Sequence, residues 1–227
     1  MKLIQVEVGQ MQNFNYVVGC AQTGSAAIVD PAWEVERVLS MASSAKLSIG
    51  AILVTHTHHD HVEGVARAWR ATGATIHVHA LEAGRLAERL EADDASGAIV
   101  SPVGDDQEID VGSLRIRCLH TPGHTPGATC YLVDGGVLTG DTLFIGRCGR
   151  TDFPGSSPEA MYGSLKRLAA LPGETVVYPG HNYADRPTST IAREREENTH
   201  MSAPDLTEFL RRRMGEGYVA RIGKVRT

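Results

Sequence analysis

A run of histidines and one aspartate is the part of this chain best suited to do chemistry. The segment 55–61 (THTHHDH) directly follows a short apolar run. Alternate side chains of an extended segment point the same way, so His56 and His58 can converge on one ion, and the turn that follows can direct Asp60 and His61 to the other side. Imidazole and carboxylate together suit zinc, iron or manganese. Burying such a cluster without a metal is costly, because each polar group needs its own partner.

Three further potential ligands occupy equivalent positions later in the chain. His124, Asp141 and His181 each follow a short apolar run and a glycine. Ligand sites of α/β sheets collect at strand ends, and a glycine lets the backbone turn tightly so that the donor points inward. With the first cluster they make seven donors, which are too many for one four-coordinate ion. Two ions that share a bridging carboxylate fit this number, and such a pair can hold a hydroxide ready to attack a carbonyl.

The elements that must position these donors alternate along the chain. Apolar runs and turn signals predict strands at 16–18, 26–29, 51–54, 75–78, 114–119, 129–133, 136–139 and 175–178. Helical spacing predicts helices at 34–45, 62–72, 81–92 and 158–170, the third of them with Glu82, Arg85 and Glu88 on its solvent face. The polar segment 93–106 is expected to be a loop. Short strands interleaved with helices indicate an α/β fold with helices on both faces of the sheet.

Composition and charge exclude several classes of function. With 42% hydrophobic and 22% charged residues in 227, the chain has ordinary globular values. A formal net charge of −5 argues against a nucleic-acid partner, which requires a basic surface. The four cysteines form no C-x-x-C pair, so neither a thiolate zinc knuckle nor a redox dithiol is suggested. The first ten residues lack the apolar core of a signal peptide, and no apolar run approaches the roughly 20 residues of a membrane span. We therefore expect a cytoplasmic protein with no membrane partner.

The metal motif also resembles that of a known family. The pattern His56-x-His58-x-Asp60-His61, continued by His124, Asp141 and His181, is similar to the metallo-β-lactamase superfamily. The stretches 140–144 (GDTLF), 149–153 (GRTDF) and 178–183 (YPGHNY) look most like the glyoxalase II branch, the hydroxyacylglutathione hydrolases, and the related persulfide dioxygenases. The resemblance covers nearly all of residues 1–200 and implies an αββα sandwich. It implies one metal site of His56, His58 and His124, a second of Asp60, His61 and His181, and Asp141 as the bridging ligand.

The resemblance implies a function as well as a fold. It predicts a metallohydrolase domain over residues 1–200, with a short helical and basic tail over 201–227 packed on the same domain. The expected reaction is cleavage of a thioester, hydroxyacylglutathione or another acyl-thiol, by a hydroxide that bridges two divalent metal ions. Zinc is the first expectation, with iron and manganese as alternatives. Asp60 is predicted to orient the hydroxide and to take its proton. Arg150 and Tyr183 fall where the family contacts its substrate, and they are predicted to bind the thiol portion.

Two questions stay open at the level of sequence. Fewer than fifty residues follow His181, so the longer C-terminal region with which glyoxalase II grips glutathione is abbreviated. The thiol could therefore be carried by glutathione, coenzyme A or a carrier protein. The segment 148–153 is also typical of persulfide dioxygenases, which use a single iron at the positions of His56, His124 and Asp141. A mononuclear iron enzyme that acts on glutathione persulfide is thus the alternative function.

Other residues near these motifs have simpler expected roles. His59 lies between two predicted ligands and is expected to point away from the ions. His120 could orient a ligand or could be an ordinary histidine. Cys148 is expected to be an unreactive loop cysteine.

Overall fold

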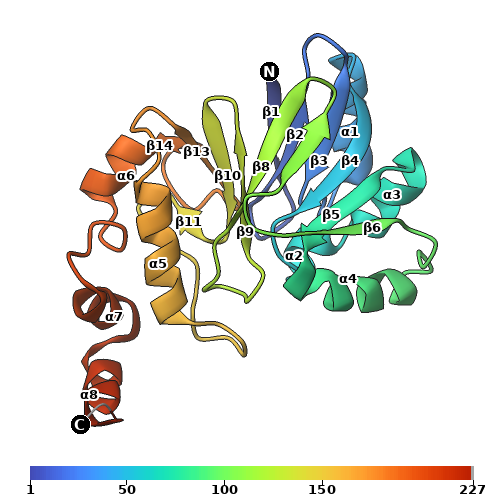
Figure 1. The fold of residues 1–227 in the computed structure, drawn as a ribbon. Coiled ribbons are helices and arrows are strands. Elements are labelled where there is room, and N and C mark those ends of the chain that lie inside the picture. Colours follow the sequence, from blue (N-terminus) through green and yellow to red (C-terminus); the bar gives the residue numbers. More distant parts are fainter. Residues whose placement is uncertain (226–227) are drawn as a thin grey trace.

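Two six-stranded sheets form the centre of the molecule (Figure 1). The computed structural model describes residues 1–225, with side chains through residue 220, so the last two residues of the predicted tail lie outside the described part. The first sheet has the order β1-β2-β3-β4-β5-β6, antiparallel from β1 to β3 and parallel from β3 to β6. Its strands are β1 (Lys2–Val8), β2 (Asn13–Gly19), β3 (Ser25–Val29), β4 (Ser48–Val54), β5 (Thr75–His79) and β6 (Val100–Val103).

The second sheet has the order β14-β13-β10-β9-β8-β7 and is antiparallel except for the parallel pair β10 and β13. Its strands are β7 (Glu108–Val111), β8 (Leu114–His120), β9 (Thr129–Val133), β10 (Gly136–Gly140), β13 (Val176–Pro179) and β14 (Ser189–Thr190). A small hairpin of β11 (Leu143–Phe144) and β12 (Arg147–Cys148) follows β10.

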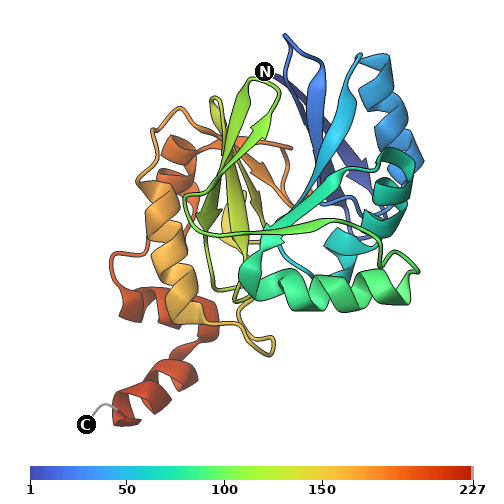
Figure 2. The same ribbon diagram turned by 45° about the vertical axis from the view of Figure 1, so that its right-hand side comes forward.

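Helices cover the outer faces of both sheets, as Figures 1 and 2 show. On the first sheet these are α1 (Val35–Ser44), α2 (His59–Val62), α3 (Val65–Thr72) and α4 (Ala80–Ala92). On the second sheet they are α5 (Pro158–Ala169) and α6 (Ile191–Glu197), followed by α7 (Leu206–Met214), whereas α8 (Glu216–Val225) contacts α7 and extends away from both sheets. The α7 helix packs against α5, so residues that follow position 200 contact the second half of the sandwich. The order of layers is helix, sheet, sheet, helix, which is the αββα sandwich that the sequence predicts.

Strand β2 shows how a central strand is buried on both faces. Its Val17 belongs to the cluster between the first sheet and its helices, whereas Tyr16 and Val18 belong to the cluster between the two sheets. Successive side chains of a strand point to opposite faces, and both faces of this sheet are covered. A third apolar cluster joins the second sheet to α5 and α7. Three apolar interfaces therefore hold the four layers together and fix the strand ends that carry the predicted ligands.

Two of the differences between the predicted and the observed elements have a clear physical reason. The predicted helix 62–72 is two helices, α2 and α3, which are separated at Gly64. A Cβ at Gly64 would lie 2.2 Å from the backbone oxygen of Ala32, so the close approach of the two segments requires glycine. The segment 93–106, expected to be a loop, contains strand β6, which extends the first sheet beside β5. Its Pro102 is compatible with this position because β6 is an edge strand.

Candidate metal centre

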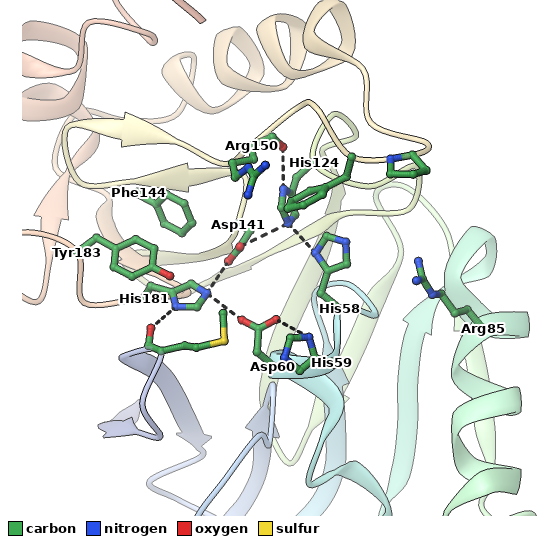
Figure 3. A pocket seen from close by; sticks show the side chains of 13 residues that line it. His58, His59, Asp60, Arg85, His124, Asp141, Phe144, Arg150, His181 and Tyr183 are labelled. Carbon is green, nitrogen blue, oxygen red and sulfur yellow. Dashed lines mark hydrogen bonds and ion pairs between the residues drawn. The ribbon is translucent and has the colours of Figure 1, made fainter. Parts of the chain in front are cut away.

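The seven predicted ligands gather between the two sheets, at the ends of strands. His56 and His58 follow β4, whereas Asp60 and His61 lie in the short helix α2. The three later donors come from the second half of the sandwich, after β8, β10 and β13: His124, Asp141 and His181. Figure 3 shows several of these side chains pointing into a common cavity. The extended segment followed by a helical turn therefore separates the first cluster into two pairs of donors, as the sequence predicts.

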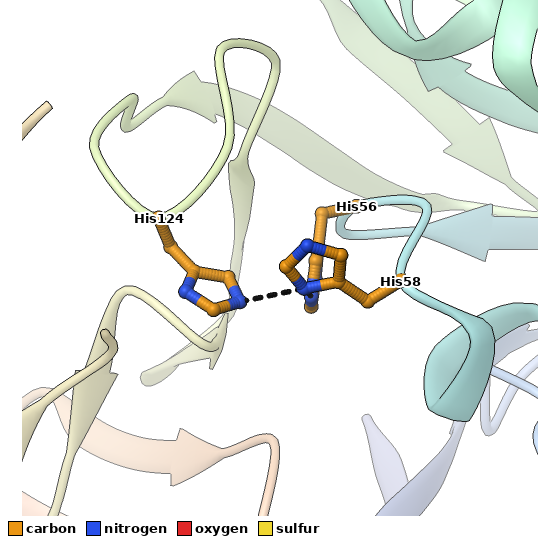
Figure 4. Close-up of side chains that lie close together, drawn as sticks. All are labelled: His56, His58 and His124. Carbon is orange, nitrogen blue, oxygen red and sulfur yellow. Dashed lines mark hydrogen bonds between the residues drawn. The ribbon is translucent and has the colours of Figure 1, made fainter. Parts of the chain in front are cut away.

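His56, His58 and His124 form the first group of donors (Figure 4). The Nδ1 atom of His58 lies 3.1 Å from Nε2 of His56 and 2.8 Å from Nε2 of His124. His56 and His124 are buried, and His58 is partly buried. One proton can satisfy only one pair of nitrogens, so three converging imidazoles leave lone pairs without a donor. A cation at this point would satisfy all three nitrogens at once.

Asp60, His61 and His181 form the second group. Nε2 of His61 and Nε2 of His181 are 3.2 Å apart. The Oδ2 atom of Asp60 lies 3.4 Å from the former and 3.3 Å from the latter. All three residues are buried. Two imidazoles and a carboxylate at these distances are a second set of donors that suits a divalent ion.

Asp141 lies between the two groups. Its Oδ2 atom is 3.4 Å from Nε2 of His124 in the first group. Its Oδ1 atom is 3.2 Å from Nε2 of His61 and 3.4 Å from Nε2 of His181 in the second. Oδ1 is buried and, within residues 1–225, receives no hydrogen bond of normal geometry. A buried carboxylate oxygen without a hydrogen bond is costly, and a metal ion would remove that cost. The donor set therefore fits divalent metal ions.

The outer nitrogens of three histidines fix which nitrogen faces the centre. Nδ1 of His61 lies 2.9 Å from Oδ2 of Asp30, Nδ1 of His124 lies 2.8 Å from the carbonyl of Arg150, and Nδ1 of His181 lies 2.9 Å from the carbonyl of Met11. Carbonyl oxygens can only accept, so Nδ1 of His124 and of His181 must donate. In the neutral ring the lone pair of each Nε2 then points into the centre, which is the arrangement of metal-binding histidines.

The charges of the centre are strongly coupled. Burial, together with the neighbouring His124, lowers the pKa of His58 to about 4, and burial lowers the pKa of His56 further below its usual value. Burial alone would lower the pKa of His181, but the adjacent carboxylates of Asp141 and Asp60 outweigh this effect and raise the pKa to about 9. At neutral pH His56 and His58 are therefore uncharged and ready to bind a cation, whereas an ion at His181 must displace a proton.

Asp30 is a functional residue that the sequence analysis missed. Its Oδ1 accepts a hydrogen bond of 2.7 Å from the backbone N–H of Thr55, and its Oδ2 accepts one of 2.7 Å from the hydroxyl of Thr55 as well as the contact from His61. Asp30 has a positive φ of 47°, a conformation that costs energy outside glycine. It directly follows strand β3, so the strand-end argument that identified the other donors also applies to this position.

Glu82 corrects a second expectation, because it is buried and does not lie on the solvent face of α4. Its Oε2 accepts hydrogen bonds from the backbone N–H of Thr57, at 3.3 Å, and from the Thr57 hydroxyl. Its Oε1 accepts a bond of 3.1 Å from the N–H of Gly127. Thr57 stands between His56 and His58, and Gly127 belongs to the loop of His124. One buried carboxylate thus connects the two loops that carry the first group of donors.

Glycines allow the close approach of the backbone around Asp141. A Cβ at Gly149 would lie 1.9 Å from the backbone oxygen of Asp141, and one at Gly180 would lie 2.7 Å from its Oδ1. Real Cβ atoms do not come so near, so both positions require glycine. Gly149 and Gly180 therefore give the space in which Asp141 reaches both groups.

Arg150 and Tyr183, the two predicted substrate contacts, both line the cavity beside the metal donors. The cavity measures about 530 Å³, and Met11, Phe144 and Phe153 form apolar parts of its wall. The ring of Tyr183 stacks on that of His181 with centroids 4.6 Å apart. The guanidinium of Arg150 lies 4.3 Å from the ring centroid of Phe153. It also forms a two-bond ion pair with Asp152, at 2.9 and 2.8 Å, which compensates part of its charge.

The remaining candidates lie at the margin of the site. His59 has 67% of its side chain exposed and lines the cavity, with Nδ1 3.7 Å from Asp60 Oδ1. His120 makes a 2.9 Å hydrogen bond to the carbonyl of Pro126 and has no contact with a metal donor in the described residues. Burial raises the pKa of the Cys148 thiol to about 11, which opposes formation of a thiolate.

Comparison with known proteins places this geometry in a family. Residues 8–181 match the Metallo-beta-lactamase superfamily. The chain is 33% identical over 180 residues to a probable polyketide biosynthesis zinc-dependent hydrolase, PksB, of Bacillus subtilis, with 79% of this chain and 77% of that protein covered. It is 37% identical over 182 residues to a hydroxyacylglutathione hydrolase of Rhodospirillum rubrum, with 79% of this chain and 66% of that protein covered. The matched region thus spans about two thirds of that hydrolase.

A solved structure agrees with the sequence relatives. The crystal structure of ETHE1 from Myxococcus xanthus superposes with a TM-score of 0.81 at 34% identity, covering 92% of this chain and 88% of that one. Among the described residues, the helices are all too short or too polar to cross a membrane. The relatives and the His/Asp cluster support a metal-dependent hydrolase with a divalent metal site. The chain belongs to the metallo-β-lactamase superfamily, within its glyoxalase II-like branch and close to the persulfide dioxygenases.

Proposed function

We propose that the protein hydrolyses a thioester with two divalent metal ions, zinc in the first place. The observation that carries this proposal is the position of Asp141, whose two carboxylate oxygens face two separate groups of donors. We assign His56, His58 and His124 to one ion and Asp60, His61 and His181 to the other, with Asp141 shared. The mixture of imidazole and carboxylate supports zinc, as does the printed description of the zinc-dependent relative.

The bound ions would supply a Lewis acid for the carbonyl oxygen and a water of lowered pKa as the nucleophile. Asp60 is the residue that we assign to orient this water and to take its proton. Its Oδ2 lies against His61 and His181, which leaves Oδ1 on the side of the cavity and of His59. Asn13 donates to Asp60 Oδ2 at 3.1 Å and to its carbonyl at 2.9 Å, so the carboxylate is held in place. These contacts keep the pKa of Asp60 below its usual value although burial opposes this, and the carboxylate is therefore ionised.

The thiol half of the substrate needs little help to leave. A thiol has a pKa of about 8.5, so it departs as the thiolate without a strong general acid. Phe144 and Phe153 offer an apolar wall for the acyl group, and Arg150 and Tyr183 stand where the thiol portion would lie. Arg150 is paired with Asp152. If an anionic group of the substrate binds to Arg150, Asp152 must release the guanidinium or share it with that group.

The proposal is tested by metal analysis together with a panel of thioesters assayed under nitrogen. We expect two ions per chain and release of free thiol without oxygen. Replacing Asp141 by Ala should remove the ligand that both groups share, so metal content and thiol release should fall together. Retention of two ions and full turnover in Asp141→Ala would contradict the assignment.

A mononuclear iron persulfide dioxygenase is the second candidate, and the similarity to ETHE1 of Myxococcus xanthus favours it. In that reaction a single iron would be held by His56, His124 and Asp141. The fixed orientation of His61 by Asp30 and of His181 by the Met11 carbonyl supports a second ion instead. Oxygen consumption with glutathione persulfide and one iron per chain would establish the alternative.

A further inference from the structure

A second cavity of about 400 Å³ lies next to the metal centre and shares only Arg150 with the first cavity. We call it the arginine pocket. It is formed by the β11–β12 hairpin, the segment that follows it, helix α7 and the turn that precedes α7. Its lining consists of Gly146, Arg147, Cys148, Arg150, His200 and Arg213. No carboxylate is among these residues, although the whole chain carries a formal net charge of −5.

Two of the three arginines have no carboxylate at ion-pair distance in the described part of the chain. Within residues 1–225, neither Arg147 nor Arg213 forms an ion pair, whereas Arg150 is paired with Asp152 at 2.8 Å. Arg213 donates from Nε to the carbonyl of Gly149 at 3.3 Å, and its guanidinium also contacts the Cys148 thiol and interacts electrostatically with Asp152. The pocket is therefore a local concentration of positive charge in an acidic protein, as expected of a site for an anion.

His200 adds an unpartnered polar atom to the same pocket. Its Nδ1 is buried and, among the described residues, has no hydrogen-bond partner. Burial lowers the pKa of His200, and the charges of Arg213, Arg212 and Arg147 lower it further. The neutral ring that results has one N–H to donate, and the arginine charges that add to the effect of burial would also attract an anion.

We propose that the arginine pocket binds a phosphate group of the thiol carrier. Arg147, Arg213 and His200 come from three different segments, and a tetrahedral phosphate can accept hydrogen bonds from several directions at once. Guanidinium groups are also the preferred partners of phosphate oxygens. The inference rests on the proposed thioester hydrolysis and names its substrate class: an acyl thioester of phosphorylated pantetheine, as found in coenzyme A and on carrier proteins.

The position of the pocket agrees with this substrate. The segment 149–150 separates it from the metal centre: the carbonyl of Gly149 faces Arg213, and the carbonyl of Arg150 accepts from the metal-facing histidine His124. A carrier that follows this segment would hold its phosphate at the arginines and its thioester at the metal donors.

The test compares thioesters that share one acyl group and differ in the carrier: coenzyme A, unphosphorylated pantetheine and glutathione. In Arg147→Ala, kcat/KM for the coenzyme A thioester should fall roughly tenfold relative to that for the pantetheine thioester, since about 1.4 kcal/mol of binding corresponds to a factor of ten. Arg213→Lys, which keeps the charge but loses the fork of donors, should act in the same direction. Arg115→Ala, an exposed arginine of β8, is the matched control and should leave both values at the wild-type level.

Two outcomes would overturn the inference. An unchanged ratio of the coenzyme A and pantetheine thioesters in Arg147→Ala would show that the phosphate does not bind there. An equal fall with the glutathione thioester would assign the pocket to a carboxylate instead. A phosphopantetheinylated acyl carrier protein distinguishes the two sources: if it is cleaved with the higher kcat/KM and with the same dependence on Arg147, the carrier is a protein.

A binding measurement separates this inference from the proposed function. Calorimetry of the metal-loaded protein with coenzyme A or inorganic phosphate needs no turnover. If coenzyme A binds, if Arg147→Ala weakens it roughly tenfold, and if no thioester is cleaved, the proposed function is wrong and the phosphate site stands. If thioesters are cleaved but coenzyme A and phosphate bind Arg147→Ala as they bind the wild type, the pocket inference alone is wrong.

Discussion

Glu82 offers the sharpest test of how the protein builds its metal centre. Three donors share this buried carboxylate: the N–H and hydroxyl of Thr57, and the N–H of Gly127. In Glu82→Ala all three lose their acceptor. Each donor that loses its acceptor, and that water does not fully satisfy, costs about 1 kcal/mol. For three donors, the free energy of unfolding should therefore fall by about 3 kcal/mol.

The same substitution should weaken metal binding, although Glu82 itself is not a ligand. Loss of a group that orients metal ligands costs about 10- to 100-fold in metal affinity. Because Thr57 lies between His56 and His58, and Gly127 lies in the loop of His124, we expect the affinity of the first group to fall by this factor. Glu82→Gln keeps the shape but has one acceptor oxygen, so at least one donor faces the amide NH₂, and the losses should be intermediate.

The assay is zinc competition with a chromophoric chelator, together with urea unfolding of the metal-free and metal-loaded forms. Glu88→Ala is the matched control, because Glu88 is exposed on the same helix. A merely structural role would lower the stability of both forms equally and leave zinc affinity unchanged. If Glu82→Ala binds both zinc ions within twofold of the wild-type affinity, the coupling of the two loops is refuted.

Three further predictions concern other parts of the centre. In Asp30→Asn the amide NH₂ can face the N–H of His61, so that two donors meet and His61 loses its fixed orientation. The second ion should then bind about 10- to 100-fold more weakly while the first ion remains bound. Equal retention of both ions in dialysis would contradict this. In the metal-free protein His181 has a pKa raised to about 9, so its protonated form stabilises the fold fully below about pH 6.5 and this stability is lost as the pH rises through 9. Urea unfolding should show this loss of stability, and zinc binding at pH 7 should release protons. A free energy of unfolding that does not change between pH 6.5 and 9 would contradict the prediction. In Gly149→Ala the new methyl group would lie 1.9 Å from a main-chain oxygen, so stability should fall by about 1–3 kcal/mol, whereas Gly163→Ala, with open space in α5, should keep or raise the melting temperature; equal melting temperatures of the two variants would refute the close approach.

The sequence predicts those parts of the fold that depend on local apolar pattern. Strands such as β4 and β9 are buried on both faces and therefore read as short apolar runs. Strands β1, β6 and β7 were not predicted, because they lie at or near sheet edges and mix exposed and buried residues. The break between α2 and α3 depends on the approach of Ala32 to Gly64, a contact between segments far apart in the chain that no local pattern reveals.

The same distinction applies to the site. The seven donors could be predicted because each follows a strand end or a glycine, and the structure brings all of them together, although their ligation remains a prediction. Asp30 satisfies the same criterion, yet its role becomes visible only when His61 is placed beside it. Helical periodicity places Glu82 on the buried face of α4, four and eight residues before Leu86 and Leu90, but its partners Thr57 and Gly127 lie in other segments and become visible only in the folded chain.

These supporting residues have one property in common that limits what sequence can tell about metal chemistry. A metal ligand needs a donor atom and a position at a strand end, and both the residue type and the preceding apolar run can be recognised in the sequence. A residue that orients a ligand needs only to reach a particular N–H in the folded chain, so Asp30, Glu82 and the carbonyl of Met11 share no motif. Groups that hold a ligating histidine in one orientation raise the affinity of its site for a metal ion. The distinction between a two-metal hydrolase and a one-iron oxygenase should therefore follow from Asp30 and Met11 more than from the ligands, which both kinds of enzyme can retain.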